Sequence, residues 1–134
     1  MAVLLDTSVL IELEREPTVL EAVLDDLGEQ TGAIAAITAS ELLHGVLRAD
    51  TAQRRDHRGQ IVERLLSALT TYPFDLAVAR HHARIWADLK TAGRMIGAHD
   101  LLIAATAVAH GLRLVTRNPA EFRRVEGLVL VEGW

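Results

Sequence analysis

The sequence contains no cysteine among its 134 residues. This absence excludes disulfide bonds, thiolate metal ligands and a cysteine nucleophile, and it fits a protein of the reducing cytoplasm. Aromatic residues are also few, at 4% of the chain, although half of all residues are hydrophobic. The core of an ordered globular protein of this composition must therefore be built mainly from Leu, Val, Ile and Ala.

Long hydrophobic runs are missing as well. The longest stretch without Asp, Glu, Lys or Arg covers the twelve residues from Leu101 to Leu112, which is too short to span a bilayer. Asp6 follows only five residues at the N-terminus, which leaves no room for the apolar segment of a signal peptide. We therefore expect a soluble, cytoplasmic protein, with residues 1–134 forming one domain.

Lysine is almost absent, because Lys90 stands beside thirteen arginines. Arginine binds phosphates and carboxylates through paired N–H groups, so this preference suits a nucleic-acid or acidic partner, with genome composition as the alternative cause. Acidic residues are concentrated in residues 1–30, which contain eight of them and only Arg15. With a pI near 5.8, any contact with nucleic acid must be local.

Short apolar runs alternate with helical patterns along the chain. This alternation predicts an α/β fold, a single domain with a mainly parallel central sheet flanked by helices. We expect strands over 3–5, 33–37 and 112–116, a weak strand over 71–74 and a last strand over 128–131. Helices are expected over 8–15, over 18–28, from Thr38 with Leu42, Leu43, Val46 and Leu47 on one face, over 51–69, 75–91 and 99–110, and from Asn118-Pro119.

Four acidic residues, Asp6, Glu41, Asp100 and Glu121, each stand at the edge of an apolar run. Partial burial of a carboxylate is costly unless hydrogen bonds or cations compensate it. Three of them follow predicted strands, whose C-terminal ends share one edge of a parallel sheet, and Asp100 opens a helix that can join them there. An all-oxygen cluster without Cys or clustered His favours Mg²⁺ or Mn²⁺ over zinc.

Each acid also has an ordinary structural explanation. Asp6 can cap a helix, Glu41 can close a capping box with Thr38, Asp100 can stabilise a helix dipole, and Glu121 can be a solvated surface residue. The six histidines are interpreted as structural or surface residues, because no His-x-x-x-His occurs. Ser8, Ser40 and Thr116 fit caps or hydroxyls that orient carboxylates. Nucleophile elbows, phosphate-binding loops and dinucleotide fingerprints are absent from the sequence.

Four segments, taken together and in order, carry a family resemblance: LDTSVLI at 5–11, ASELLHG at 39–45, IGAHDLLIAATA at 96–107 and LVTRNPAEF at 114–122. They resemble the PIN-domain family, in particular the VapC-type toxins of bacterial toxin–antitoxin pairs. The resemblance implies a single α/β domain acting as a Mg²⁺- or Mn²⁺-dependent ribonuclease. It implies that Asp6, Glu41 and Asp100 form the acidic metal site, with Glu121 at a position where the family usually has Asp.

The same resemblance assigns supporting roles and partners. Thr7 and Thr116 are expected to orient the site or lie near substrate, and Asn118 borders the site or caps its helix. Local charge, rather than the resemblance, gives two basic stretches as candidate phosphate contacts, with a solvated surface as the alternative for both: Arg113, Arg117, Arg123 and Arg124 in one and Arg48, Arg54, Arg55 and Arg58 in the other. A homodimer is expected, with a cognate antitoxin whose C-terminal segment lies across the active-site groove. Apolar residues of the early helices, such as Val9, Leu13 and Val19, are candidates for that contact, with packing in the core of the chain as the alternative.

The expected reaction is hydrolysis of an RNA phosphodiester, with either Glu41 or Glu121 accepting the proton of the attacking water. Two rival functions stay open at this point. One is a metal-dependent phosphatase acting on small phosphate esters. The other is a catalytically silent PIN-like binding module, which the Glu at position 121 favours.

Overall fold

The computed structural model describes the chain except for residues 1, 17, 19–21, 23–31 and 132–134. Its sheet consists of β1 (Val3–Leu5), β2 (Gly32–Ala35), β3 (Thr70–Tyr72) and β4 (Arg113–Val115). The strand order is β3-β2-β1-β4, and every neighbouring pair is parallel. The predicted α/β fold with a mainly parallel sheet is confirmed.

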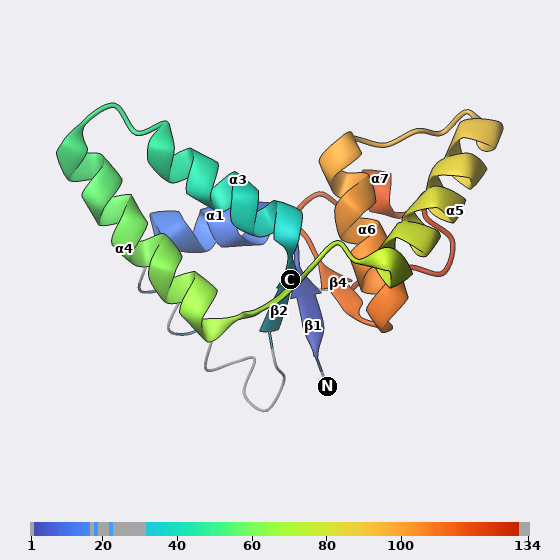
Figure 1. The fold of residues 1–134 in the computed structure, drawn as a ribbon, viewed down its shortest axis with the longest axis horizontal. Helices are drawn as coiled ribbons and strands as arrows, with labels where there is room; N and C mark the ends of the chain where they lie inside the picture. The colour runs from blue at the N-terminus through green and yellow to red at the C-terminus, as the bar shows by residue number, and fades with distance from the viewer. Residues whose placement is uncertain (1, 17, 19–21, 23–31, 132–134) are drawn as a thin grey trace.

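Helices cover both faces of this sheet (Figure 1). On one face lie α1 (Thr7–Arg15), α3 (Ala36–Leu47) and α4 (Ala52–Ala68), and on the other lie α5 (Leu76–Ala92), α6 (Ala98–His110) and α7 (Pro119–Phe122). Side chains alternate along the central strand β1, so Val3 and Leu5 enter the core on the α1 side and Leu4 enters the core on the α6 side. Burial on both faces explains why this strand is entirely apolar.

Local capping signals set several helix ends where the sequence predicts them. The Thr51 hydroxyl accepts the Arg54 amide at the start of α4, and the Asp75 carboxylate accepts the Val78 amide at 3.0 Å at the start of α5. Gly111 ends α6 with a φ of 63°, a left-handed conformation that favours glycine. The predicted helices over 51–69, 75–91 and 99–110 are therefore confirmed to within a residue at each end.

The start of α3 differs from the prediction. The helix begins at Ala36 rather than at Thr38, and strand β2 ends at Ala35 rather than at residue 37. Thr38 therefore lies inside the helix, where it cannot form the predicted capping box. The predicted apolar face is also wrong in part, because Leu42 is buried but Leu43 is exposed and Leu47 is 74% exposed.

Two predicted strands change in extent. The strand expected over 71–74 lies at Thr70–Tyr72, because Pro73 has no N–H to donate to the sheet. The segment 128–131 joins β4 only through an isolated parallel bridge between Leu114 and Leu130, so the predicted last strand is reduced to one pairing. The helix expected over 18–28 falls largely outside the described residues. Within the described part of the chain, helices with the length and apolar character needed to cross a membrane are absent.

Candidate active site

All four predicted acids meet at the C-terminal edge of the sheet. Asp6 directly follows β1, Glu41 lies in the second turn of α3, Asp100 lies in the first turn of α6, and Glu121 belongs to α7. The Asp100 carboxyl is close enough to the other three for each of their charges to raise its pKa. The topology of the sheet therefore brings together side chains that are separated by up to 115 residues.

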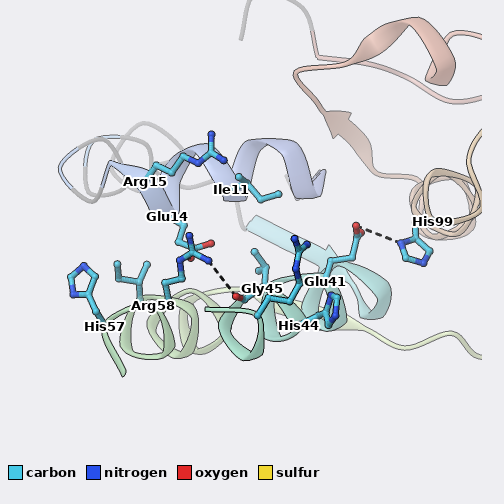
Figure 2. Close-up of a pocket in the computed structure, with 12 residues that line it drawn as sticks. Ile11, Glu14, Arg15, Glu41, His44, Gly45, His57, Arg58 and His99 are labelled. Carbon is cyan, nitrogen blue, oxygen red and sulfur yellow. Dashed lines mark hydrogen bonds and ion pairs between the residues drawn. The ribbon is translucent and has the colours of Figure 1, made fainter. Parts of the chain in front are cut away.

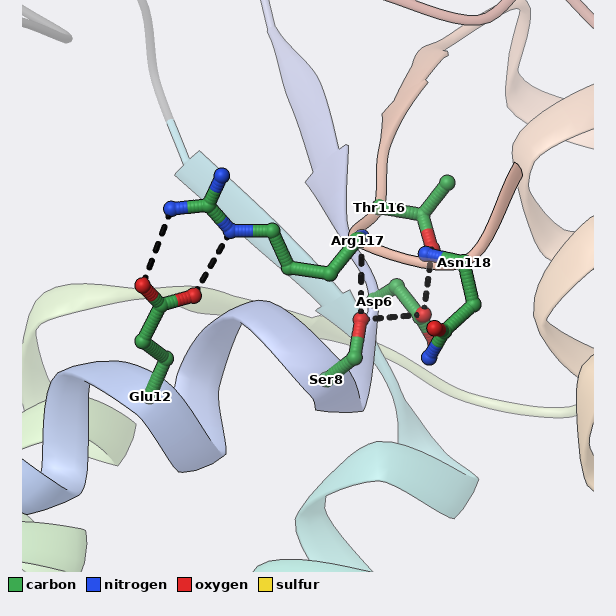
Figure 3. A network of polar contacts seen from close by, with 6 residues as sticks. All are labelled: Asp6, Ser8, Glu12, Thr116, Arg117 and Asn118. Atoms are coloured by element: carbon green, nitrogen blue, oxygen red, sulfur yellow. Dashed lines mark hydrogen bonds and ion pairs between the residues drawn. The ribbon is translucent and has the colours of Figure 1, made fainter.

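Asp6 is 4% exposed and is held by hydroxyl groups (Figure 3). Its Oδ2 accepts hydrogen bonds from Ser8 Oγ at 2.8 Å and from Thr116 Oγ1 at 2.7 Å. Each hydroxyl also accepts a backbone N–H, Ser8 from Arg117 at 3.1 Å and Thr116 from Asn118 at 3.0 Å. These amides direct the hydroxyl protons toward Asp6 and leave Oδ1 available to another ligand.

Asp6 does not cap α1, although it occupies the N-cap position, because its carboxylate makes no hydrogen bond to the helix amides. The capping explanation of Asp6 is therefore wrong. Asn118 stands likewise at the N-cap position of α7 without a side-chain cap bond. Thr116 occupies the position predicted for it beside the acids, and Ser8 ties the loop after β4 to the start of α1.

Glu41 is oriented by α1 and faces α6. Its Oε1 accepts a hydrogen bond from Thr7 Oγ1 at 2.8 Å, and its Oε2 lies 3.5 Å from His99 Nδ1. Thr7 also contacts Thr38 Oγ1 at 3.1 Å, and both threonines are buried. The capping box expected of Thr38 and Glu41 is replaced by this contact between helices. Sequence reasoning missed Thr38 and the His99–Glu41 pair, since nothing in local spacing links α3 to α1 or α6.

The carboxyl groups of Asp100 and Glu121 share a hydrogen bond. Burial, followed by the hydrogen bond to Glu121 and the charges of Asp6, Glu121 and Glu41, raises the pKa of Asp100 from 3.8 to about 7. The pKa of Glu121 is lowered, first by the hydrogen bond from Asp100 and then by the Gly97 amide and Arg124. This hydrogen bond therefore raises the pKa of Asp100 and lowers that of Glu121, and Glu121 is not the free surface residue of the structural explanation.

The chemistry of this cluster fits a hard divalent cation. All four acidic groups offer oxygen, and the pKa of Asp100 is raised first by burial, then by the hydrogen bond to Glu121 and by neighbouring negative charges that a cation would offset. A Cβ on Gly97 would lie 3.6 Å from Asp100 Oδ2 and 3.9 Å from Glu121 Oε2, so the glycine leaves room beside them. In the part of the chain that the structure describes, three acidic or histidine side chains do not yet converge on a single point. A bound ion would have to replace the proton between Asp100 and Glu121.

Several predicted contacts are wrong or take other partners. Arg113 begins β4 at the opposite end of the strand from Thr116, which places it away from the acids. Arg117 lies beside them but binds Glu12 through two bonds of 2.6 and 3.0 Å (Figure 3). Val9 and Leu13, expected to meet the antitoxin, are buried in the core on the α1 side, because they form the inward face of that helix. Val19 lies outside the described residues.

The remaining predicted arginines differ in how they are held. Arg124 donates to the Met95 carbonyl at 2.9 Å, and Arg55 donates to the Ala49 carbonyl at 2.8 Å. Arg54 pairs with Asp50 at 2.7 Å. Arg48 and Arg123 have no side-chain partner among the described residues.

A groove of about 660 Å³ opens beside Glu41 (Figure 2). Its walls come from α1 on one side and from α3 and α4 on the other, and His99 of α6 lies beyond Glu41 at one end. Of the four acids, Glu41 lines this groove, so the groove reaches the acidic cluster at that residue.

Comparison with known proteins agrees with this geometry. The PIN domain family model matches residues 3–128. Ribonuclease VapC1 of Rickettsia felis is 38% identical over 96% of this chain and 93% of its own length. The tRNA(fMet)-specific endonuclease VapC of Shigella flexneri is 34% identical over 81% of this chain and 80% of its own length.

A solved structure agrees as well. In the crystal structure of VapBC2 from Rickettsia felis bound to a DNA fragment from their promoter, the matching chain has a TM-score of 0.89 and 29% identity, covering 100% of this chain and 99% of that chain. The resemblance drawn from the four sequence segments is thereby confirmed. The chain belongs to the PIN-domain family and, within it, to the VapC-type ribonucleases.

Proposed function

We propose that this chain is a Mg²⁺- or Mn²⁺-dependent endoribonuclease and the toxin of a type II toxin–antitoxin pair. Its relatives carry the names of ribonucleases and of a tRNA-specific endonuclease, and a solved neighbour is a VapBC assembly. The observation that carries the proposal is that Asp6, Glu41 and Glu121 all lie near enough to Asp100 for their charges to raise its pKa. A group of four carboxyls beside a groove suits hydrolysis of a polymer by a hard cation.

In this proposal, Asp6 and Asp100 hold the cation, with Glu41 and Glu121 beside them. The cation supplies Lewis-acid activation of water and stabilises the negative charge of the transition state. Ser8 and Thr116 fix the direction of the Asp6 carboxylate. Glu41, which Thr7 orients through a hydrogen bond to Oε1, would accept the proton of the attacking water.

The remaining parts of the proposal concern assembly and place of action. We infer that residues 1–134 act as one nuclease domain in the cytoplasm, where RNA is the substrate. A cognate antitoxin would inhibit the chain by laying its C-terminal segment across the groove. Ile11, exposed on α1 and lining that groove, replaces the buried Val9 and Leu13 as the apolar contact on this helix. A homodimer is inferred from the exposed Phe74, Leu76 and Trp86.

The test compares the wild-type protein with Asp6→Ala and Asp100→Ala. Purified protein with Mn²⁺ is expected to cleave RNA, to lose this activity in EDTA, and to leave a small chromogenic phosphate ester intact. Both variants should lose cleavage while keeping their helical circular dichroism spectra. Sequencing RNA ends after induction of wild type against Asp6→Ala then identifies the RNA that is cut.

The control substitution is Asp88→Ala, which removes a carboxylate from the exposed surface of α5. It should leave cleavage unchanged. Hydrolysis of the phosphate ester in preference to RNA would assign the site to a phosphatase. Tight antitoxin binding without cleavage of any RNA would instead make the chain a silent binding module.

A further inference from the structure

The groove between α1 and the α3–α4 pair extends well beyond the acidic cluster. Figure 2 shows Glu41 near one end, with His99 beyond it, and His57 of α4 at the other end. The carboxylates that would perform hydrolysis occupy only the end at Glu41. The proposed reaction therefore leaves most of the groove without a role.

One face of α3 forms the floor of this groove. Glu41, His44, Gly45 and Arg48 all line it, at helical spacings of three, four and seven residues. Seven residues at the α-helical rise place Arg48 about 10 Å along the axis from Glu41. The backbone of Arg48 therefore lies away from Glu41 along the same groove.

The far part of the groove is lined by arginines. Arg15 of α1 and Arg48, the C-cap residue of α3, line it, and neither has a side-chain partner among the described residues. Arg58 of α4 is fixed beside them, because it pairs with Glu14 at 3.5 Å and donates to the Gly45 carbonyl at 3.3 Å. Two guanidinium groups without a partner in the described part of the chain favour a local positive field, although the net charge of the chain is −4.

Gly45 leaves the part of α3 in the middle of the groove without a side chain. A Cβ at this position would meet nothing within 4 Å, so packing within the chain does not require a glycine. Glycine in a helix interior costs about 0.5–1 kcal/mol relative to alanine. Its presence between Glu41 and Arg48 keeps the track open for a chain that approaches the helix backbone.

We propose that this groove binds the RNA backbone beside the scissile bond, with Arg48 and Arg15 gripping a phosphate that is not cut. The inference rests on the proposed ribonuclease function and adds the path of the substrate to it. Arginine suits this contact because its planar fork matches phosphate oxygens. The three arginines that line this part of the groove favour a polyanion over a peptide as the substrate-state occupant.

The experiment measures binding and cleavage by Arg48→Gln and by the double variant Arg15→Gln/Arg48→Gln. Binding of a fluorescent RNA oligonucleotide is followed by anisotropy at several salt concentrations, in an Asp6→Asn background that prevents cleavage. Each lost phosphate contact should weaken binding several-fold and lower the slope of log Kd against log salt by about 0.7. Cleavage of the oligonucleotide should show a raised KM with kcat little changed.

A dinucleotide supplies the internal control, since its only phosphate is the scissile one and Arg48 cannot contact another. Its cleavage should be equal in wild type and in both variants. Arg84→Gln, on α5 across the sheet, is the matched surface control and should leave binding and salt slope unchanged.

The possible outcomes separate the two proposals. An unchanged salt slope in the double variant, in a protein that cleaves RNA, overturns the groove assignment alone. Equal weakening by Arg84→Gln also overturns it, because the contact would then be non-specific. Unchanged RNA binding together with weaker binding of the antitoxin's C-terminal peptide would give the groove to protein instead. Failure of the wild type to bind or cleave any RNA would reject the proposed function itself.

Discussion

The pKa of Asp100 depends on the burial of this residue and on all three of the other acids in the cluster. Burial, the bond to Glu121 and three neighbouring negative charges all favour its protonated form, which raises its pKa to about 7. A group whose folded-state pKa is raised in this way binds more protons in the folded chain than in the unfolded chain. In the metal-free protein, ionisation of Asp100 therefore lowers the free energy of unfolding as the pH rises toward neutrality.

The sign of this effect gives a testable pH dependence. The Asp100 contribution favours folding below the unfolded pKa of 3.8 and is lost as pH rises to about 7. In EDTA, the unfolding free energy of the wild type should therefore fall from about pH 5 to about pH 8 relative to Asp100→Asn. Urea unfolding followed by circular dichroism measures this difference.

Two comparisons sharpen the measurement. Asp88→Asn removes an exposed acid from α5 and should follow the wild-type curve. Mn²⁺ should stabilise the wild type at neutral pH and have a smaller effect on Asp100→Asn, because ligand binding to the folded state adds stability. If the unfolding free energies of wild type and Asp100→Asn changed in parallel with pH, the raised pKa of Asp100 would be contradicted.

At the scale of elements, α3 serves two purposes with one face. Its first turns carry Thr38 and Glu41 toward α1, and its later turns continue as the groove floor. The bare position at Gly45 follows from the second purpose rather than from folding. Substitution at this glycine therefore separates helix stability from the use of the groove.

Gly45→Ala is expected to stabilise the protein by about 0.5–1 kcal/mol, because alanine favours the helix and its Cβ meets no neighbour. Thermal unfolding should show a melting temperature raised by a few degrees. Gly111→Ala is the opposite control, since its φ of 63° strains any residue with a side chain. A lower melting temperature for Gly45→Ala would mean that the added Cβ meets neighbouring atoms, so that the space beside Gly45 is not open.

At the scale of the whole molecule, the parallel sheet separates two cores and leaves an apolar patch outside them. Phe74 and Leu76, at the start of α5, and Trp86, further along the same helix, are exposed at 51%, 67% and 48%. His82 holds the two aromatic rings in edge contacts at 5.5 and 5.8 Å. A fixed aromatic patch on a chain with few aromatic residues is suited to a protein interface.

We expect Trp86→Glu to dissociate the inferred homodimer, because a charge would be buried at the centre of the patch. Light scattering after size-exclusion chromatography measures the mass of each species. Thr91→Glu adds the same charge to an exposed position further along α5 and should leave the mass unchanged. A dimer that persists in Trp86→Glu with normal stability would move the interface elsewhere on the chain.

The sequence by itself determined the alternation of strands and helices, most helix ends and the identity of the four acids. These features depend on residue periodicity, caps and glycines, which act over a few neighbouring positions. The prediction failed where a distant partner decides, as at Thr38, whose hydroxyl contacts Thr7 instead of capping a helix. The prediction that Arg113 contacts phosphate failed for the same reason, because only the direction of β4 places this residue away from the acids.

Tertiary structure alone decided how the acids meet and what supports them. The bond from Thr116 to Asp6, the contact of His99 with Glu41 and the hydrogen bond between Asp100 and Glu121 join residues that are distant in the sequence. Local sequence cannot encode such contacts, because they follow from strand order and from the packing of helices at one sheet edge. The groove and the arginines that line it follow from the same packing.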